Sequence, residues 1–197
     1  MDETEGAGLA DIPPLQEIRQ RLTTEISPHH FYSTVAEAGL QLQRKFQVLK
    51  ELYWDPSSLE VLGRAEVDTD LHLGTSFESS FGIHPALLDG TLQLPAMGIL
   101  ATPEGHTPDL FVPAGIKTAT ISFKTQPHSR TLWSHIKVGA RDTEKGTLDI
   151  QMTVWDGEGR AVAAFQHFTY QQVKMGRTMQ QAAIRELRET TTLWQGV

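Results

Sequence analysis

The sequence predicts an α+β fold in which antiparallel strands surround one apolar helix. The first observation is a change of period: from about Phe46 onward, apolar residues recur mostly at every second position, as half-buried strands require. The second is the segment 85–100, which is apolar on most sides and therefore typical of a buried helix. The third is the presence of tight turn sequences between strand-like segments, such as "DGEG" at 156–159.

Two helices are expected before the first strand. Residues 1–14 are acidic and contain Gly and Pro, and we expect them to form a flexible leader. An amphipathic helix follows, marked by apolar residues at helical spacing: Leu15, Ile18, Leu22 and Ile26. A short second helix is predicted over 27–39, because Ser27 is a good N-cap, Pro28 suits the first helical position and Gly39 suits the C-terminal cap.

The rest of the chain is mainly strand-like. An extended segment is predicted from Phe46 through Trp54, and the polar stretch 68–80 is expected to be a loop. Further strands are predicted at 59–67, 110–112, 116–123, 131–138, 147–155 and 160–173. The segment 174–197 is expected to form a final helix, from Thr178 to about Arg188, and a tail.

Composition excludes several classes of protein. The chain has 197 residues, of which 39% are hydrophobic and 21% charged, as in one soluble globular domain. Its formal net charge is −7 and it has no basic stripe, so we expect no nucleic-acid partner. Cysteine is absent, which excludes disulfides and thiolate metal sites. With neither a bilayer-spanning apolar run nor a signal-peptide pattern, a cytoplasmic protein without a membrane partner is expected.

The apolar segment 85–100 contains one carboxylate, Asp89, with Gln93 four residues later. Positions i and i+4 share one helix face, so the amide can orient the carboxyl by a hydrogen bond. Burial disfavours the charged form of a carboxyl group, and a carboxyl that keeps its proton near neutral pH can serve as a general acid. The alternative is a carboxylate at the polar edge of the helix with a purely local role, and the residues leave both open.

Other signatures of a reactive or ligand-binding site are missing. The eight histidines show neither H-x-x-x-H nor H-E-x-x-H spacing, so no metal is expected. The glycine-rich phosphate-binding patterns and the G-x-S-x-G nucleophile elbow are also absent. We therefore expect no cofactor.

The stretch "HPALLDGTLQ", residues 84–93, resembles the H-P-a-l-L-D-x-x-x-Q motif of dehydratase domains in modular polyketide synthases. Residues 15–54, 110–122 and 153–173 are similar to the same domains in the same order. The resemblance covers residues 15–173 and is to the second, C-terminal half of these domains. It implies a hot-dog fold, in which an antiparallel sheet wraps around one long helix, and two such halves form a double hot-dog.

The resemblance also implies roles for individual residues. In the family the Asp protonates the departing hydroxyl group, and the Gln one turn later holds that Asp in position. Asp89 would then be the general acid and Gln93 its orienting partner. His84, Pro85 and Phe46 would line the substrate tunnel.

Two family features are not preserved. The first-half motif H-x-x-x-G-x-x-x-x-P, whose His removes the α-proton and whose Gly amide stabilises the oxyanion, is missing. "HIKVG" at 135–139 imitates its start, but Glu144 stands at the Pro position, so we treat the match as coincidental. The family's Y-G-P-x-F is "LQRKF" at 42–46, which argues against the usual tunnel shape.

Pro95 is expected to kink the helix just after Gln93.

Three hypotheses of function follow. The first is half of a lyase of polyketide, and hence antibiotic, biosynthesis. It would dehydrate 3-hydroxyacyl chains on the phosphopantetheine arm of an acyl carrier protein, with the His half supplied by a partner chain or domain, or with a homodimer mate completing the tunnel. The second is a non-catalytic scaffold or docking module with a dehydratase fold. The third is altered chemistry by Asp89, namely double-bond isomerisation, cyclisation or thioester hydrolysis.

Overall fold

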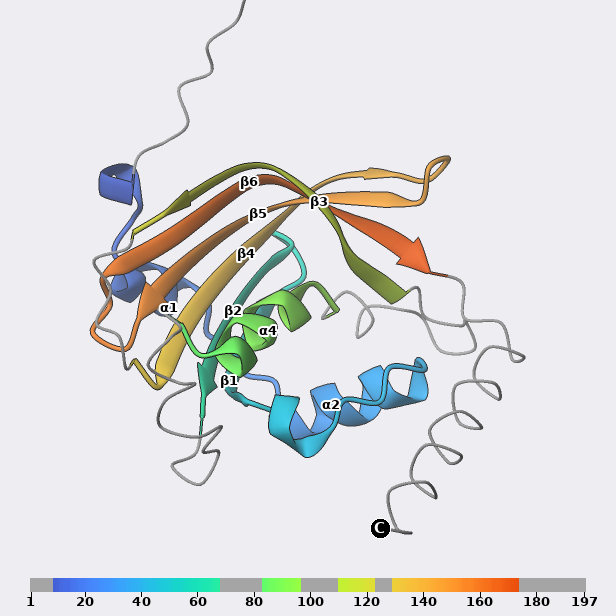
Figure 1. Cartoon of the computed structure of the whole chain (residues 1–197), viewed down its shortest axis with the longest axis horizontal. Coiled ribbons are helices and arrows are strands. Elements are labelled where there is room, and N and C mark those ends of the chain that lie inside the picture. Colours follow the sequence, from blue (N-terminus) through green and yellow to red (C-terminus); the bar gives the residue numbers. More distant parts are fainter. Residues whose placement is uncertain (1–8, 68–82, 97–109, 123–128, 174–197) are drawn as a thin grey trace, which may run out of the picture.

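The computed structural model describes residues 9–67, 83–96, 110–122 and 129–173, and its main feature is a six-stranded antiparallel sheet. The strand order across the sheet is β1-β2-β4-β5-β6-β3. The strands are β1 (Leu49–Asp55), β2 (Glu60–Glu66), β3 (Leu110–Ile121), β4 (Thr131–Asp142), β5 (Thr147–Asp156) and β6 (Ala161–Val173). The sheet curves over the helix α4 (Pro85–Gln93), as Figure 1 shows, so a sheet wrapped around one helix is observed as predicted.

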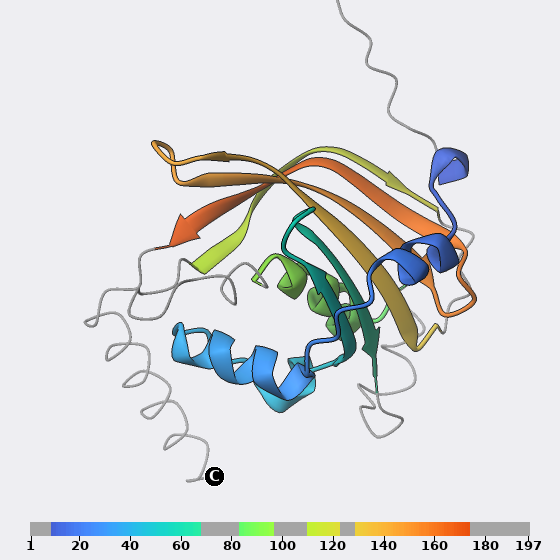
Figure 2. The ribbon, with the colours of Figure 1, turned by 180° about the vertical axis from the view of Figure 1, so that it is seen from behind.

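The remaining helices are short: η1 (Leu9–Asp11), α1 (Leu15–Arg21), α2 (Pro28–Glu37) and η2 (Arg44–Phe46). Figure 2 shows α1 lying across the sheet, on the face opposite α4. Within the described residues no helix combines the length and the apolar composition that crossing a bilayer requires.

Glycine lets α4 approach the inner face of the sheet closely. A Cβ atom added to Gly90 would lie 2.6 Å from Val48 Cγ2, and one added to Gly63 would lie 2.5 Å from Leu94 Cδ2. Both distances are too short for real carbon contacts, so a side chain at either glycine would require its neighbour to shift. Leu87 and Leu94 are fully buried in the contact, which forms the main core of the protein.

A second, smaller core lies under α1 on the outer face of the sheet. Its buried members come from α1, its C-cap and three strands: Leu15, Ile18, Leu22, Leu62, Trp133 and Trp155. The guanidinium of Arg19 also stacks over the Trp133 ring, 4.6 Å from its centroid. The apolar spacing seen in the sequence therefore marks the face of α1 that packs on the sheet.

The two edges of the sheet differ. At the β1 edge, Ile26 N donates to Leu52 O and Trp54 N donates to Thr24 O, both at 2.9 Å, so a preceding segment covers this edge. At the other edge, β3 pairs only with β6 among the described strands. Ile116 and Ile121 of β3 are 49% and 45% exposed. An edge strand with exposed apolar side chains is a site for pairing or packing with another element.

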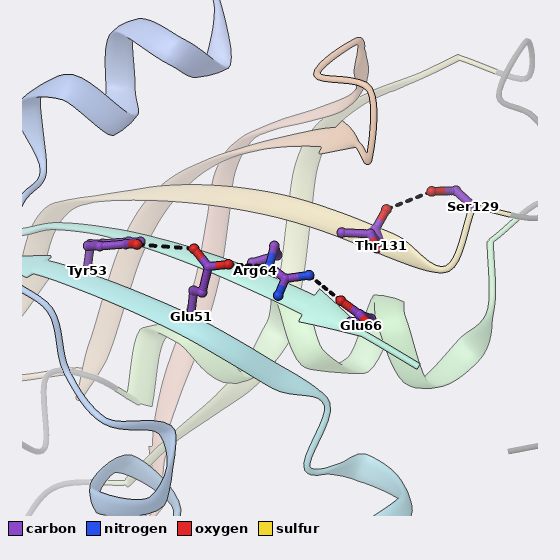
Figure 3. Close-up of polar contacts among 6 residues, drawn as sticks. All are labelled: Glu51, Tyr53, Arg64, Glu66, Ser129 and Thr131. Atoms are coloured by element: carbon purple, nitrogen blue, oxygen red, sulfur yellow. Dashed lines mark hydrogen bonds and ion pairs between the residues drawn. The ribbon is translucent and has the colours of Figure 1, made fainter. Parts of the chain in front are cut away.

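A ladder of polar side chains crosses β1 and β2 (Figure 3). Tyr53 Oη donates to Glu51 Oε2 at 3.1 Å, and Arg64 Nε donates to Glu51 Oε1 at 2.6 Å. Arg64 also pairs with Glu66. Half-exposed ion pairs of this kind contribute about 0–1 kcal/mol each, so they support the register of β1 on β2 but do not carry the fold.

Two predicted helices differ in extent from the observed ones. The first was expected to reach Ile26, but α1 ends at Arg21, because Ile26 is extended and pairs with the β1 edge. The apolar helix was predicted over 85–100, whereas α4 ends at Gln93 and a 3₁₀ turn covers 94–96. Pro95 has no N–H to continue the helix, so the expected disruption after Gln93 is observed.

Two predicted strands also differ. The one expected from Phe46 begins at Leu49, because residues 44–46 form η2. The separate segments 110–112 and 116–123 form one strand, β3, with a bulge between Pro113 and Gly115. The predicted loop 68–80, residues 97–100 and the helix predicted from Thr178 lie outside the described residues.

Candidate active site

The candidate site is built on α4, whose first turn is organised by His84. His84 has extended backbone angles and occupies the N-cap, and its Nδ1 accepts a hydrogen bond from Ala86 N at 3.1 Å. Pro85 takes the first helical position and is exposed. Because Nδ1 accepts, the proton of a neutral ring is on Nε2, which is buried and has no hydrogen-bond partner in the described part of the chain. His84, predicted to line a tunnel, therefore caps the helix.

Asp89 and Gln93 meet one turn apart on α4. Gln93 Nε2 donates to Asp89 Oδ2 at 2.7 Å, as the i, i+4 spacing predicted. Asp89 is half-buried, and no other described residue donates a hydrogen bond to its carboxyl group. Among the described residues, one oxygen of the carboxyl group is thus held by Gln93, and Oδ1 receives no hydrogen bond.

The surroundings of this pair are less apolar than the sequence suggested. The segment was expected to be a buried helix, apolar on most sides, but Leu88 is 39% exposed and Leu92 is only half-buried. The reason is that α4 turns Leu87, Gly90 and Thr91 towards the core, so Leu88 lies on another side of the helix. One side of α4 therefore faces outward at the candidate site.

Gln93 is held by two further contacts. Its Nε2 also donates to the carbonyl of Phe46 at 2.9 Å, and its Oε1 accepts from Tyr32 Oη at 3.1 Å. Tyr32 Oη in turn accepts from Leu49 N at 3.0 Å. The amide is 8% exposed, so these bonds are made inside the protein, where they are stronger than in water.

The charge of Asp89 raises the pKa of two nearby tyrosines, Tyr32 and Tyr170. Burial raises the pKa of Tyr32 far above its ordinary value, the Leu49 amide opposes this, and the Asp89 charge adds to it. Burial and the Asp89 charge also raise the pKa of Tyr170, whose Oη donates to Leu92 O at 3.1 Å. Both hydroxyl groups therefore stay neutral at physiological pH and act as hydrogen-bond donors.

Phe46 contributes its backbone to the site. Its carbonyl accepts the hydrogen bond from Gln93, while the residue as a whole is 39% exposed. Arg44 and Lys45, which stand in the altered "LQRKF" stretch, complete the η2 turn that contacts α4. The predicted tunnel residue is thus placed beside Gln93.

His135 lies on the other side of the sheet. It pairs with Leu62 across β2 and β4, and Leu62 belongs to the outer core under α1. His135 Nε2 is 2.7 Å from Glu60 Oε2, which also binds Arg21 at 2.6 Å. The side chain of His135 therefore lies on the face of the sheet opposite α4 and Asp89.

Two grooves in the described part of the chain lie away from Asp89. The larger, about 740 Å³, is on the outer face and includes Arg19, Tyr53 and Trp133 in its lining. The smaller lies beside the β5–β6 turn. Among the described residues no cluster of His, Asp and Glu is arranged to hold a metal ion.

Tyr32 is the site residue that the sequence analysis missed. It belongs to α2, where the neighbouring Phe31 and the later Val35 mark the buried face. A tyrosine beside such a face shows only that a hydroxyl group lies near the core boundary. Its contact with Gln93 spans 61 residues of sequence, and no local pattern indicates it.

Residues 10–179 match the family model described as "Polyketide synthase dehydratase N-terminal domain". The chain is also 30% identical over 118 residues to highly reducing polyketide synthase 2 of Gibberella zeae. That alignment spans 60% of this chain and 4% of the synthase.

Several solved dehydratase domains have a similar structure. The domain from the CurJ module of curacin polyketide synthase has a TM-score of 0.66 at 21% identity, over 82% of this chain and 53% of that one. The domain of RzxB from Pseudomonas fluorescens has a TM-score of 0.63 at 18% identity, over 82% and 54%. A trans-AT dehydratase domain from Brevibacillus brevis has a TM-score of 0.65 at 19% identity, over 82% and 54%. The predicted hot-dog fold is confirmed, and the chain spans about half the length of these structures.

Proposed function

The chain belongs to the polyketide synthase dehydratase family, and from this premise we propose that it is the general-acid half of a dehydratase. Its substrate is a 3-hydroxyacyl chain bound to an acyl carrier protein. Asp89 is the general acid and Gln93 orients it. The catalytic His comes from another polypeptide or domain, or from a homodimer mate that completes the tunnel.

The observation that carries this proposal is the hydrogen bond from Gln93 Nε2 to Asp89 Oδ2 at 2.7 Å. A carboxyl group held through one oxygen presents the other in a fixed direction. Its half-buried position limits competition from water. An oriented, partly shielded carboxyl group is suited to protonate a leaving hydroxyl group.

The proposed reaction needs two groups. A base takes a proton from the α-carbon, the bond between the β-carbon and oxygen breaks, and a double bond forms between the two carbons. The departing hydroxyl group takes the proton of Asp89 and leaves as water. The base then carries one proton and Asp89 lacks one, so a transfer between them or through solvent resets the site.

Neither His84 nor His135 is placed to be that base. His135 is engaged with Glu60 on the outer face, and His84 caps α4. This supports a His supplied from outside the chain, in keeping with the missing H-x-x-x-G-x-x-x-x-P motif.

The exposed apolar residues of the edge strand β3 supply a surface for the partner to pack on. Ile116 and Ile121 lie opposite Phe168 and Ala163 of β6, two buried residues of the main core, and so are on the concave face that holds α4. Their exposure and the outward-facing Leu88 leave an apolar surface on the side of the candidate site. We infer that the second half packs there and shields Asp89.

The assignment to the C-terminal half rests on residues. The family model carries the description of an N-terminal domain. The stretch "HPALLDGTLQ" nevertheless holds the acid and its Gln, while the His motif of the first half is missing. We therefore infer that this chain corresponds to the half that bears the acid.

The test is reconstitution. Purified chain is mixed with a polypeptide that carries the His half, and carrier-bound 3-hydroxyacyl chains are followed by mass spectrometry. We expect rapid loss of water only in the mixture, with the chain alone slower by about 10²–10⁴. Asp89→Asn should abolish turnover and keep the circular dichroism spectrum. Asp149→Asn, a carboxyl group paired with His167, is the matched control and should remain active.

A second candidate, a non-catalytic scaffold, is favoured by one observation. The "LQRKF" stretch keeps only Phe46 of the family's tunnel motif, and its backbone is committed to Gln93. A scaffold predicts no turnover even with the His half, while the β3 surface still binds a partner. The same reconstitution separates the two candidates.

A further inference from the structure

We propose that Tyr32 is the positioning residue of this site: its hydroxyl group fixes the Gln93 amide and thereby selects Oδ1 of Asp89 as the oxygen that carries the reactive proton. The claim that Oδ1 of Asp89 carries the reactive proton rests on the proposed function. The claim that Tyr32 fixes the Gln93 amide does not, because it concerns hydrogen bonds within this chain.

The direction of the Tyr32 hydrogen bond follows from its neighbours. The N–H of Leu49 lies 3.0 Å from Tyr32 Oη and can only donate, so the oxygen accepts there. The hydroxyl proton is left to point at Gln93 Oε1, 3.1 Å away. Tyr32 keeps this proton because burial raises its pKa.

Two separate contacts, one at each end of the side-chain amide, then fix the orientation of Gln93. The carbonyl of Phe46 is an acceptor only, so the atom that faces it at 2.9 Å must be Nε2. Tyr32 requires an acceptor at the other end of the amide, which is Oε1. A flipped amide would set Oε1 against Phe46 O and Asp89 Oδ2, so that three partly buried acceptors face one another without a donor.

This orientation distinguishes the two oxygens of Asp89. Nε2 donates to Oδ2 at 2.7 Å, so a proton on Oδ2 would compete with that donor. Neutral Asp89 therefore carries its proton on Oδ1, to which no described group donates. The general acid thus has one defined reactive atom.

The hydrogen bonds from Leu49 to Tyr32 and from Tyr32 to Gln93 join three secondary-structure elements, each fixed by packing. Tyr32 lies on α2, edge-to-face with the fully buried Phe31 at a ring distance of 5.2 Å. Leu49 begins β1, and Gln93 ends α4. A site held by helices and a strand keeps its geometry more precisely than one held by loops.

Tyr32→Phe removes the hydroxyl group and keeps the ring. Tyr170→Phe is the matched control, because that buried hydroxyl group also contacts α4 but binds Leu92 O instead of Gln93. The readout is proton NMR of the Gln93 side-chain amide, assigned by its loss in Gln93→Ala. In the wild type we expect its protons to exchange with water at least tenfold more slowly than those of the exposed Gln41.

In Tyr32→Phe this protection should fall at least tenfold, and in Tyr170→Phe it should stay. Unchanged protection in Tyr32→Phe, or equal loss in both variants, would overturn the positional role.

With the His half present, Tyr32→Phe should lower kcat about tenfold with KM unchanged. A changed KM with the same kcat would overturn the catalytic consequence. If no variant of the chain supports turnover, the proposed function fails while the NMR result still decides the role of Tyr32.

A measurement on the wild type serves if Tyr32→Phe does not fold. The Tyr32 hydroxyl proton should exchange slowly enough to give a separate resonance, with a nuclear Overhauser contact to the Gln93 amide protons. A hydroxyl proton in fast exchange, or in contact with another group, would overturn the proposal.

Discussion

Gln93 Nε2 donates a hydrogen bond to the carbonyl of Phe46 at 2.9 Å and so joins the end of α4 to η2, 47 residues earlier in the chain. The contact is made by the backbone of Phe46, not by its ring. The neighbouring Arg44 and Lys45 can therefore differ from the family pattern while the carbonyl that Gln93 needs stays in place.

Gln93→Leu should destabilise the protein. The change keeps the side chain's approximate size but leaves the partly buried Phe46 carbonyl and Tyr32 hydroxyl group without this partner. At about 1–3 kcal/mol for each unsatisfied group, we expect the free energy of unfolding to fall by about 2–4 kcal/mol in urea denaturation. Gln41→Leu, at an exposed position, is the control and should change it by less than about 0.5 kcal/mol. Equal stability of both variants would show that the hydrogen bonds contribute nothing.

Gly90→Ala should also lower the melting temperature, although alanine favours helix by about 1 kcal/mol. The added Cβ would lie 2.6 Å from Val48 Cγ2, so α4 must move from the sheet at a cost of about 1–3 kcal/mol. Gly115→Ala in β3 is the control, because nothing lies within 4 Å of its Cβ position. A more stable Gly90→Ala would mean that helix and sheet are less tightly packed than described.

The pair of Glu60 and His135 should make stability fall in acid. Burial lowers the pKa of His135 below its ordinary 6.5, although Glu60 opposes this. Burial raises the pKa of Glu60, but hydrogen bonds from Arg21 and His135 outweigh it and hold the pKa below its ordinary 4.5. Each folded-state pKa is therefore lower than the unfolded one, and the unfolded chain binds protons first as pH falls.

The free energy of unfolding should thus decrease below about pH 6.5 through His135, and again below about pH 4.5 through Glu60. Each pKa unit of difference contributes about 1.4 kcal/mol. Urea denaturation between pH 8 and pH 4 measures the effect. His135→Gln should remove the first decrease, and His29→Gln, at an exposed position on α2, should retain it. A wild-type stability independent of pH between 7 and 5 would contradict the assignment.

Lysine at both Ile116 and Ile121 should weaken association with the His half or a homodimer mate. Burying one isoleucine contributes about 1.5–3 kcal/mol, so the double variant should bind more than tenfold more weakly in sedimentation experiments. Its own melting temperature should change little, because both side chains are about half exposed. Leu59→Lys, 44% exposed in the β1–β2 turn, is the control. Undiminished association would place the interface elsewhere.

The boundaries of α1 and α4 show where local patterns stop being sufficient. The apolar spacing of Leu15, Ile18 and Leu22 predicts the packed face of α1, but Ile26 continues the same spacing and lies outside the helix. Its position follows from the unpaired edge of β1, whose backbone groups need hydrogen-bond partners.

Several properties were determined by the sequence alone, because each depends on residues a few positions apart. The change of period predicts the strands, and the i, i+4 spacing brings Gln93 to Asp89. The lack of an N–H in Pro95 disrupts the helix just after Gln93, as expected, although the helix itself was predicted to continue to residue 100. Hydrogen bonds within one turn and side-chain alternation along one strand are local, so a single sequence contains them.

The tertiary structure alone decided the partners that lie far apart in the chain. Tyr32 reaches Gln93 across 61 residues, Phe46 reaches it across 47, and His135 reaches Glu60 across 75. These contacts depend on which strands are neighbours and in which register they pair. A shift of one residue would turn His135 from the outer face to the inner face, where α4 lies. Strand order and register are set by the packing of the whole core, so no local stretch of sequence could have placed these side chains together.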